Sequence, residues 1–223
     1  MRRMLCLMLC ICFLMLPAEA AQDEKLVALT FDDGPSGRFT RKLLRGLEER
    51  DARATFLLCG YRMEQYPALT EQILEQGHEI GLHGYSHKPL GDLCLRDIAR
   101  ELEMTGALIP EGAEVRFFRA PGGACSPGIQ KAARNAGLSV LLWSVDPRDW
   151  ATEDAHSVET AVVEQLRDGD VILLHDMSDS SVEAALSIVD KLQPQGFRFV
   201  TVSELAAAKG IPLTPGQVYS HFR

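Results

Sequence analysis

Residues 26–37 read LVALTFDDGPSG, an apolar and β-branched run that ends at two aspartates and then at Gly34-Pro35. Val, Thr and Phe favour strands, whereas Asp, Gly and Pro favour turns. The stretch therefore predicts a buried strand over residues 26–31 that opens into a loop carrying Asp32 and Asp33. The same layout recurs along the chain, and the recurrence indicates the fold.

Six further short runs of apolar or β-branched residues follow the first one. They cover residues 54–59, 79–83, 115–119, 138–145, 170–175 and 197–202. Segments with helical periodicity lie between the runs, at residues 40–50, 63–76, 92–109, 126–136, 157–167 and 181–192. Strict alternation of this kind predicts parallel strands joined by crossover helices in one α/β domain. Seven strands without a domain-sized break predict a barrel or a nearly closed sheet.

The first twenty residues differ from the rest of the chain. Arg2 and Arg3 precede an apolar run over residues 4–16, and Ala18-Glu19-Ala20 places small residues before a cut at Ala21. This is the pattern of a secretory signal peptide. The alternative is an uncleaved membrane anchor, but the apolar run is shorter than the ~20 residues that a span needs. We therefore expect a signal peptide over residues 1–20 and a single domain over residues 21–223.

The charge of the chain excludes some partners. The net charge is −8, and cleavage would remove two arginines and one glutamate, which changes it to −9. Nucleic acids and anionic membranes attract Lys/Arg patches, so we expect neither as a partner. Cys59, Cys94 and Cys125 remain after cleavage and allow at most one disulfide.

Titratable residues stand at the ends of five of the seven predicted strands. In parallel α/β folds, sites lie where the carboxyl ends of the strands meet. A turn, a structural histidine pair, an ion pair or a core histidine could explain each residue singly, but none explains the shared placement. The residues are Asp32, Asp33, His83, His87, Arg119, Asp146, Asp149 and His175.

These residue types suit hydrolysis at a metal ion. A catalytic zinc uses three protein ligands and leaves one position for water, so Asp33, His83 and His87 form a candidate ligand set. Successive side chains of a strand point to opposite faces, which leaves Asp32 free to act as general base where the strand ends. The metal would lower the pKa of a water molecule and polarise a carbonyl. His175 could then protonate the leaving group, and the N–H of Gly122 could bind the oxyanion.

The chain resembles the NodB-type polysaccharide deacetylases, carbohydrate esterase family 4, over nearly all of its mature length. Five stretches carry the resemblance: TFDDGP at 30–35, HGYSH at 83–87, RAP at 119–121, DW at 149–150 and LLH at 173–175. The resemblance implies a distorted seven-stranded (β/α) barrel. It also implies Asp32 as the base and Asp33, His83 and His87 as the metal ligands, in agreement with the argument from the residue types.

The resemblance also implies roles for the remaining site residues. Arg119 orients the base, and Asp149 partners the acid His175. The backbone N–H of Gly122 faces the oxyanion, while Trp150 and Leu173 wall the site.

Three residues depart from the commonest family pattern. Leu82 stands where the family often has Asn, Gly84 where it usually has Ser or Thr, and Gly122 where it usually has an aromatic residue. Gly122 keeps the backbone N–H but opens the substrate groove. Because the usual hydroxyl steadies the metal loop, Gly84 predicts a metal loop that is less firmly held.

The expected function is that of a secreted, metal-dependent deacetylase in the cell envelope. It would use one divalent ion, Zn²⁺ or else Co²⁺ or another, to release acetate from an N-acetylated glycan. Cell-wall peptidoglycan, at N-acetylglucosamine or N-acetylmuramic acid, is the expected substrate, and we expect a monomer without a stable membrane anchor. One alternative is an O-acetyl esterase acting on a xylan-type polymer; the other is a non-catalytic relative that binds metal or glycan.

Overall fold

The computed structural model describes residues 24–223, and the strands of its single sheet all pair in parallel. The strands are β1 (Lys25–Asp32), β2 (Ala54–Leu58), β3 (Glu79–Leu82), β4 (Phe117–Phe118), β5 (Ser139–Leu141), β6 (Val171–His175), β7 (Phe197–Phe199) and β8 (Val218–Tyr219). Their order is β6-β1-β2-β3-β4-β5-β8, and β7 pairs with the start of β1.

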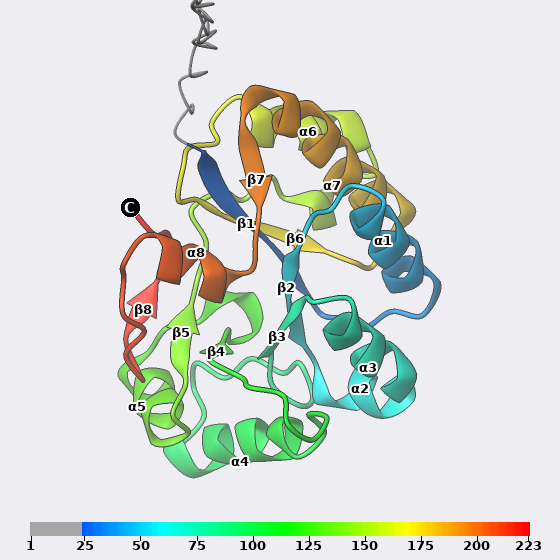
Figure 1. Cartoon of the computed structure of the whole chain (residues 1–223). Helices are drawn as coiled ribbons and strands as arrows, with labels where there is room; N and C mark the ends of the chain where they lie inside the picture. The colour runs from blue at the N-terminus through cyan, green and yellow to red at the C-terminus, as the bar shows by residue number, and fades with distance from the viewer. Residues whose placement is uncertain (1–23) are drawn as a thin grey trace, which may run out of the picture.

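Helices surround this sheet on its outer side (Figure 1). They are α1 (Arg38–Glu48), α2 (Gly60–Gln65), α3 (Pro67–Glu75), α4 (Leu95–Gly106), α5 (Pro127–Asn135), α6 (Ala155–Val163), α7 (Asp179–Leu192) and α8 (Val202–Ala208). Three short 3-10 turns are η1 (Pro121–Gly123), η2 (Asp149–Ala151) and η3 (Gln193–Gln195).

The sheet closes into a distorted barrel through the segment that follows β5. Val145 forms a parallel bridge with Ile172 of β6, and the Leu173 N–H donates to the Val145 carbonyl at 3.0 Å. The order of paired strands that begins at β6 therefore leads, through the segment after β5, back to β6. The predicted (β/α) barrel is confirmed, with parallel strands and crossover helices as the alternation required.

Strand β1 shows how the sequence pattern produces two faces. Val27, Leu29 and Phe31 are buried and pack with residues of α1 and α7, outside the barrel. Ala28 packs in a second apolar cluster, which also contains Leu57, Phe117, Leu141 and Val171. Because side chains alternate along a strand, Thr30 and Asp32 share the face of Ala28 and point into the barrel.

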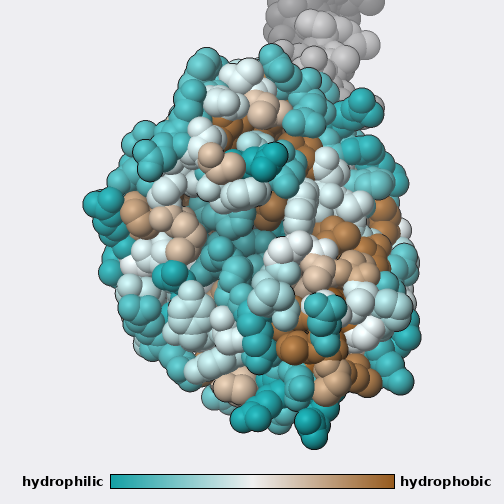
Figure 2. All heavy atoms as spheres, turned by 180° about the vertical axis from the view of Figure 1, so that it is seen from behind, coloured by the Kyte–Doolittle hydropathy of each residue, from teal (hydrophilic) through white to brown (hydrophobic). Residues whose placement is uncertain are grey.

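Figure 2 shows the opposite side of the molecule from Figure 1, covered mainly by hydrophilic side chains with apolar ones in patches between them. No helix among residues 24–223 is long and apolar enough to cross a membrane. Over the same residues, Cys59, Cys94 and Cys125 are free, so none of them forms a bridge. The predicted signal peptide over residues 1–20 lies outside the described residues.

Several predicted boundaries were wrong, and local chemistry explains two of them. The single helix predicted over residues 63–76 is α2 followed by α3, because Pro67 begins a new helix after Tyr66 leaves the helical conformation. The strand predicted to run to residue 202 ends at Phe199. Thr201 instead caps α8, and it forms a capping box with Glu204.

The remaining differences concern short strands. β4 and β5 cover only parts of the predicted runs 115–119 and 138–145, and β8 was not expected. Two paired residues leave too little periodicity in a sequence to be recognised as a strand.

Candidate active site

Asp32 lies at the end of β1 and is held inside the barrel by Arg119. One guanidinium nitrogen, Arg119 Nη1, donates both to Asp32 Oδ1 at 2.6 Å and to Thr30 Oγ1 at 2.9 Å. The Arg119 guanidinium also donates to the carbonyls of Leu141 and Leu142, at 3.2 and 2.8 Å. Both side chains are almost completely buried, so the pair is fixed in position. Buried charges need such partners.

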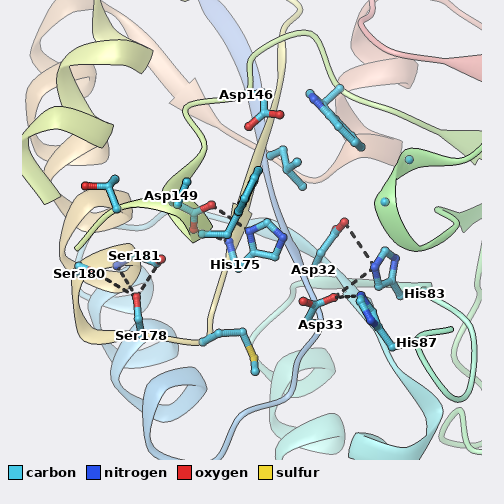
Figure 3. A pocket seen from close by; sticks show the side chains of 18 of the residues that line it. Asp32, Asp33, His83, His87, Asp146, Asp149, His175, Ser178, Ser180 and Ser181 are labelled. Atoms are coloured by element: carbon cyan, nitrogen blue, oxygen red, sulfur yellow. Dashed lines mark hydrogen bonds and ion pairs between the residues drawn. The ribbon is translucent and has the colours of Figure 1, made fainter. Parts of the chain in front are cut away.

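Asp33, His83 and His87 converge on one point beside Asp32 (Figure 3). Asp33 Oδ1 lies 3.2 Å from His83 Nε2 and 2.8 Å from His87 Nε2. Asp33 has a left-handed backbone, with φ of 73°, which breaks the alternation of the strand. Both adjacent carboxylates can therefore face the site, as the sequence required.

His83 is oriented by a bond on the far side of its ring. Its Nδ1 lies 2.8 Å from the carbonyl oxygen of Arg119, so Nδ1 carries the hydrogen and Nε2 points toward Asp33. Metal-binding histidines are oriented in this way by a carbonyl or carboxylate partner. Arg119 thus holds Asp32, the predicted base, with its side chain and His83, a predicted metal ligand, with its backbone carbonyl.

The three residues fit a divalent metal ion. One ligand atom from each of Asp33, His83 and His87 lies within 4.8 Å of the others. Asp33 Oδ1 is buried and lacks a well-directed hydrogen bond, as expected of an oxygen placed for an ion. Burial acts to raise the pKa of Asp33, but the two imidazoles outweigh it and hold that pKa well below its usual range. A carboxylate ionised at all ordinary pH values is the form that binds metal.

Asp149 and His175 form a second pair on the other side of the cavity (Figure 3). His175 Nδ1 lies 2.8 Å from Asp149 Oδ1, and the His175 N–H donates to Asp149 Oδ2 at 2.8 Å. Burial lowers the pKa of His175, but Asp149 and the more distant Asp32 and Asp33 raise it to about 8. The imidazole is therefore protonated at neutral pH, and its Nε2 is free of Asp149.

One cavity of about 820 Å³ joins these groups. Gly122, Leu173 and Trp150 line it, as expected of the residues assigned to the oxyanion and the walls. Gly122 has a φ of 67°, and a Cβ there would meet nothing within 4 Å, so this side of the cavity is open. Trp150 is 60% exposed at the rim.

Two residues that sequence reasoning missed also shape the site. Trp143 lines the cavity and covers the Arg119 guanidinium, with 5.4 Å from its ring to that group. It packs so closely on Gly123 that a Cβ there would lie 2.5 Å from the indole. Thr30 bonds Arg119 from inside the barrel. Trp143 lies within the predicted strand run 138–145, two residues beyond the end of β5. Its place after the carboxyl end of a strand was the signal that could have marked it as a site residue.

The metal loop, residues 83–87, is held by bonds that involve no side chain at position 84, and that it is less firmly held than a loop with Ser or Thr there stays a prediction. Gly84 has a φ of 80°, which glycine adopts without strain. The carbonyls of Gly84 and Tyr85 accept from the N–H groups of Gly60 and Tyr61, both at 3.0 Å. Glu101 of α4, also missed from the sequence, binds the other side of the loop. The brace comes from backbone bonds and a distant carboxylate rather than from a hydroxyl at position 84.

Asp176 supports the turn that follows Asp33. It is completely buried, and Thr40 Oγ1 donates to it. A Cβ on Gly34 would lie 2.5 Å from Asp176 Oδ1, so only glycine fits at that position. Burial raises the pKa of Asp176 to about 7. The Asp-Gly-Pro turn is thus a packed part of the site and not only a chain reversal.

Comparison with known proteins agrees with this geometry. Residues 19–141 match the polysaccharide deacetylase family. The chain belongs to the polysaccharide deacetylase family, and it is a hydrolytic deacetylase. The resemblance to NodB-type enzymes is therefore confirmed.

Three relatives illustrate the range of the family. A peptidoglycan-N-acetylglucosamine deacetylase from Bacillus cereus is 38% identical in an alignment of 198 residues that covers 86% of this chain and 92% of the relative. A peptidoglycan-N-acetylmuramic acid deacetylase from Bacillus subtilis, PdaC, is 34% identical over 87% of this chain, but the match spans only 42% of PdaC. A family 4 acetyl xylan esterase from Clostridium thermocellum, in complex with a cobalt ion, has a TM-score of 0.82 and 33% identity. That match covers 88% of this chain and 98% of the esterase.

Proposed function

We propose that this protein hydrolyses the N-acetyl group of an amino-sugar polymer in a metal-dependent reaction that releases acetate. The observation that carries the proposal is the arrangement around one cavity: a candidate metal site, a base held by Arg119 and an acid held by Asp149. Asp33, His83 and His87 would hold the ion. When bound, a divalent ion lowers the pKa of a water molecule and polarises a carbonyl.

Each remaining step belongs to residues of this chain. Asp32, fixed by Arg119, takes a proton from the attacking water. The backbone N–H of Gly122 donates to the oxygen of the acetamide as negative charge develops there. Leu173 and Trp150 pack around the acetyl group and the sugar. His175 gives its proton to the departing nitrogen, so that acetate and a glucosamine unit are released.

The protonation states at neutral pH suit these roles. His175, with its pKa raised to about 8 by Asp149 despite burial, holds a proton before the reaction begins. A general acid works best when its pKa lies near the working pH.

Cell-wall peptidoglycan is the substrate that we favour, because the Bacillus cereus and Bacillus subtilis relatives are both named as peptidoglycan deacetylases. Within peptidoglycan we favour N-acetylglucosamine. Asp146 and Glu153 add carboxylates to the cavity lining, and among the described residues no lysine or arginine lines it. Away from the ion and the protonated His175, the lactyl carboxylate of N-acetylmuramic acid would therefore meet carboxylates of like charge.

We further propose that residues 1–20 direct export and that the protein works as a monomer in the cell envelope, with Zn²⁺ or Co²⁺ as its ion. The pattern of Arg2, Arg3 and the apolar run supports export. The cobalt-bound xylan esterase supports a divalent ion in a fold of this kind.

An O-acetyl esterase is the second candidate, since the same groups can attack an ester and the esterase relative is similar over nearly its full length. A non-catalytic binding protein is disfavoured. Binding alone requires neither a base with its own buried arginine nor an acid with its own buried aspartate.

Acetate release from purified peptidoglycan, N-acetylglucosamine oligomers and acetylated xylan tests the proposal. Each assay is run with Zn²⁺ or Co²⁺ and with a chelator. We expect release from the first two substrates, loss of release with chelator, and a decrease of at least ~100-fold in Asp32→Asn. Asp190→Asn is the matched control, because Asp190 is exposed on α7 and pairs with Arg50.

Release from xylan alone would establish the esterase instead. A folded, metal-loaded protein that releases acetate from none of the three would overturn the enzymatic proposal.

A further inference from the structure

The loop that carries His87 has an unusual backbone. Gly84 has a φ of 80° and His87 a φ of 57°, so two of its residues are left-handed. For a residue other than glycine this conformation is sterically unfavourable. His87 is also more exposed than the other two ligands, with a side chain 42% exposed. Something outside the loop must keep His87 directed at Asp33.

Glu101 of α4 receives hydrogen bonds from both sides of His87. Its Oε2 accepts from the backbone N–H groups of Tyr85 and Ser86, at 2.8 and 2.9 Å. Ser86 Oγ donates to Oε1 at 3.0 Å, and Lys88 Nζ lies 2.8 Å from the same oxygen. One carboxylate thus joins the residues immediately before and after the ligand.

The position of Glu101 on α4 is otherwise unfavourable. It is only 4% exposed and lies on the buried face of the helix with Ile98, Leu102 and Thr105. Burying a carboxylate costs free energy unless its bonds compensate. Here the bonds go to the metal loop, which indicates that the loop is the reason for a glutamate at this position.

We propose that Glu101 is a positioning residue that sets the metal affinity of the site by holding His87 in its binding orientation. This inference rests on the metal site of the proposed function. A glutamine at this position keeps the size but replaces one acceptor oxygen by an NH₂ group, which cannot accept from the loop. The loop would then sample orientations in which His87 points away from Asp33, and each binding event would have to restore the bound orientation.

Titration with Co²⁺ of the metal-free protein, followed by the visible absorption of the bound ion, tests the proposal without relying on activity. We expect Glu101→Gln to raise the Co²⁺ dissociation constant by roughly 10–100-fold, the usual effect of removing a group that orients a ligand. Activity at saturating Co²⁺ should return close to that of the unchanged protein, because the bound site has the same ligands.

Glu159→Gln is the matched control. Glu159 of α6 is also 4% exposed, and it accepts hydrogen bonds from Ser187 and Lys191 of α7. Neither partner belongs to the metal loop. Both variants should lose thermal stability, but only Glu101→Gln should lose Co²⁺ affinity. Equal affinity in Glu101→Gln and the unchanged protein overturns the inference.

Two smaller changes keep the test open if Glu101→Gln does not fold. Ser86→Ala and Lys88→Met each remove one side-chain donor to Glu101 and should each weaken Co²⁺ binding by a few-fold; no change in either would also count against the proposal. An unchanged protein that binds no Co²⁺ at all would instead refute the metal site itself.

Discussion

At the scale of single residues, His175 must carry a proton to act as the acid, and Asp149 sets the pH range in which it does. Burial lowers the pKa of His175, and Asp149 outweighs burial to raise it to about 8. The protonated form is therefore present below about pH 8 and is lost as the pH rises further. In Asp149→Asn the neutral amide no longer raises this pKa, so the alkaline fall in kcat/KM should move to lower pH by about one unit or more.

The measurement is a pH profile of kcat/KM at saturating metal, with Asp190→Asn as the control whose profile should not move. An unchanged alkaline limb in Asp149→Asn would show that another group supplies the proton.

The site residues that could be predicted from the sequence are polar residues that stand at the ends of predicted strands. Asp33, His83 and His87 converge as the strand-end pattern required, and Asp32 and Arg119 meet although 87 positions separate them. Glu101 could not be found in this way, because the backbone N–H groups of Tyr85 and Ser86, which it binds, leave no mark on the sequence. An acidic residue on the apolar face of an amphipathic helix was the one available sign.

At the scale of elements, the metal loop packs against the start of α2, and this contact makes a prediction. A Cβ on Gly60 would lie 2.4 Å from Tyr85 Cδ2 and 3.1 Å from Tyr85 Cα. The ring can rotate away, but the backbone of the metal loop has to move. Gly60→Ala should therefore weaken Co²⁺ binding by roughly 10-fold or more, as a disturbed support of a ligand does.

Isothermal titration with Co²⁺ measures this effect. Gly106→Ala, at the end of α4, is the control, because a Cβ there meets only Leu82 at an ordinary 4.0 Å. Equal Co²⁺ affinities in the two variants would mean that the start of α2 does not support the loop.

Long elements with clear signals were predicted well, and short ones were not. The strand run at residues 26–31 and the helical segment at residues 126–136 appear as β1 and α5, and Ser126 Oγ caps α5 by accepting from the Ile129 N–H. The capping box of α8 was present in the sequence as Thr201-Val202-Ser203-Glu204, but the apolar run before it extended the predicted strand too far. Where two signals overlap, hydrogen bonds decide the boundary.

At the scale of the whole molecule, the C-terminal segment closes one end of the barrel core. Phe222 is fully buried and stacks on Tyr219 at 5.5 Å, and its N–H donates to the Gly169 carbonyl at 2.7 Å. Phe222→Ala should reduce the free energy of unfolding by about 3–5 kcal/mol, the cost of emptying a buried aromatic site. Because Phe222 is not among the residues that line the site cavity, kcat well below the melting temperature should be unchanged.

Denaturant unfolding and kinetics at low temperature check the two parts separately. His221→Ala is the control, since His221 is exposed next to Phe222. A similar loss of stability in both variants would contradict the role of the buried ring.

The barrel itself was predictable because alternation of strands and helices leaves few arrangements. The closure of the barrel could not be predicted. It depends on a bridge to Ile172 from Val145, which lies beyond the end of the three-residue strand β5. The eighth strand was equally difficult to predict, because β8 has two residues and pairs at the edge of the sheet with β5.

The position of β1 has a consequence for the way the protein is made. β1 carries both aspartates, yet two of its three partners, β6 and β7, are encoded near the other end of the chain. As synthesis proceeds from the N-terminus, the three predicted metal ligands are present once His87 has emerged, but β6 and β7 have not yet been made. A nascent or proteolytically shortened chain that lacks residues beyond 170 therefore lacks two of the three strands that pair with β1, and it also lacks His175. We therefore expect deacetylation only from a chain that has been synthesised beyond β6 and β7.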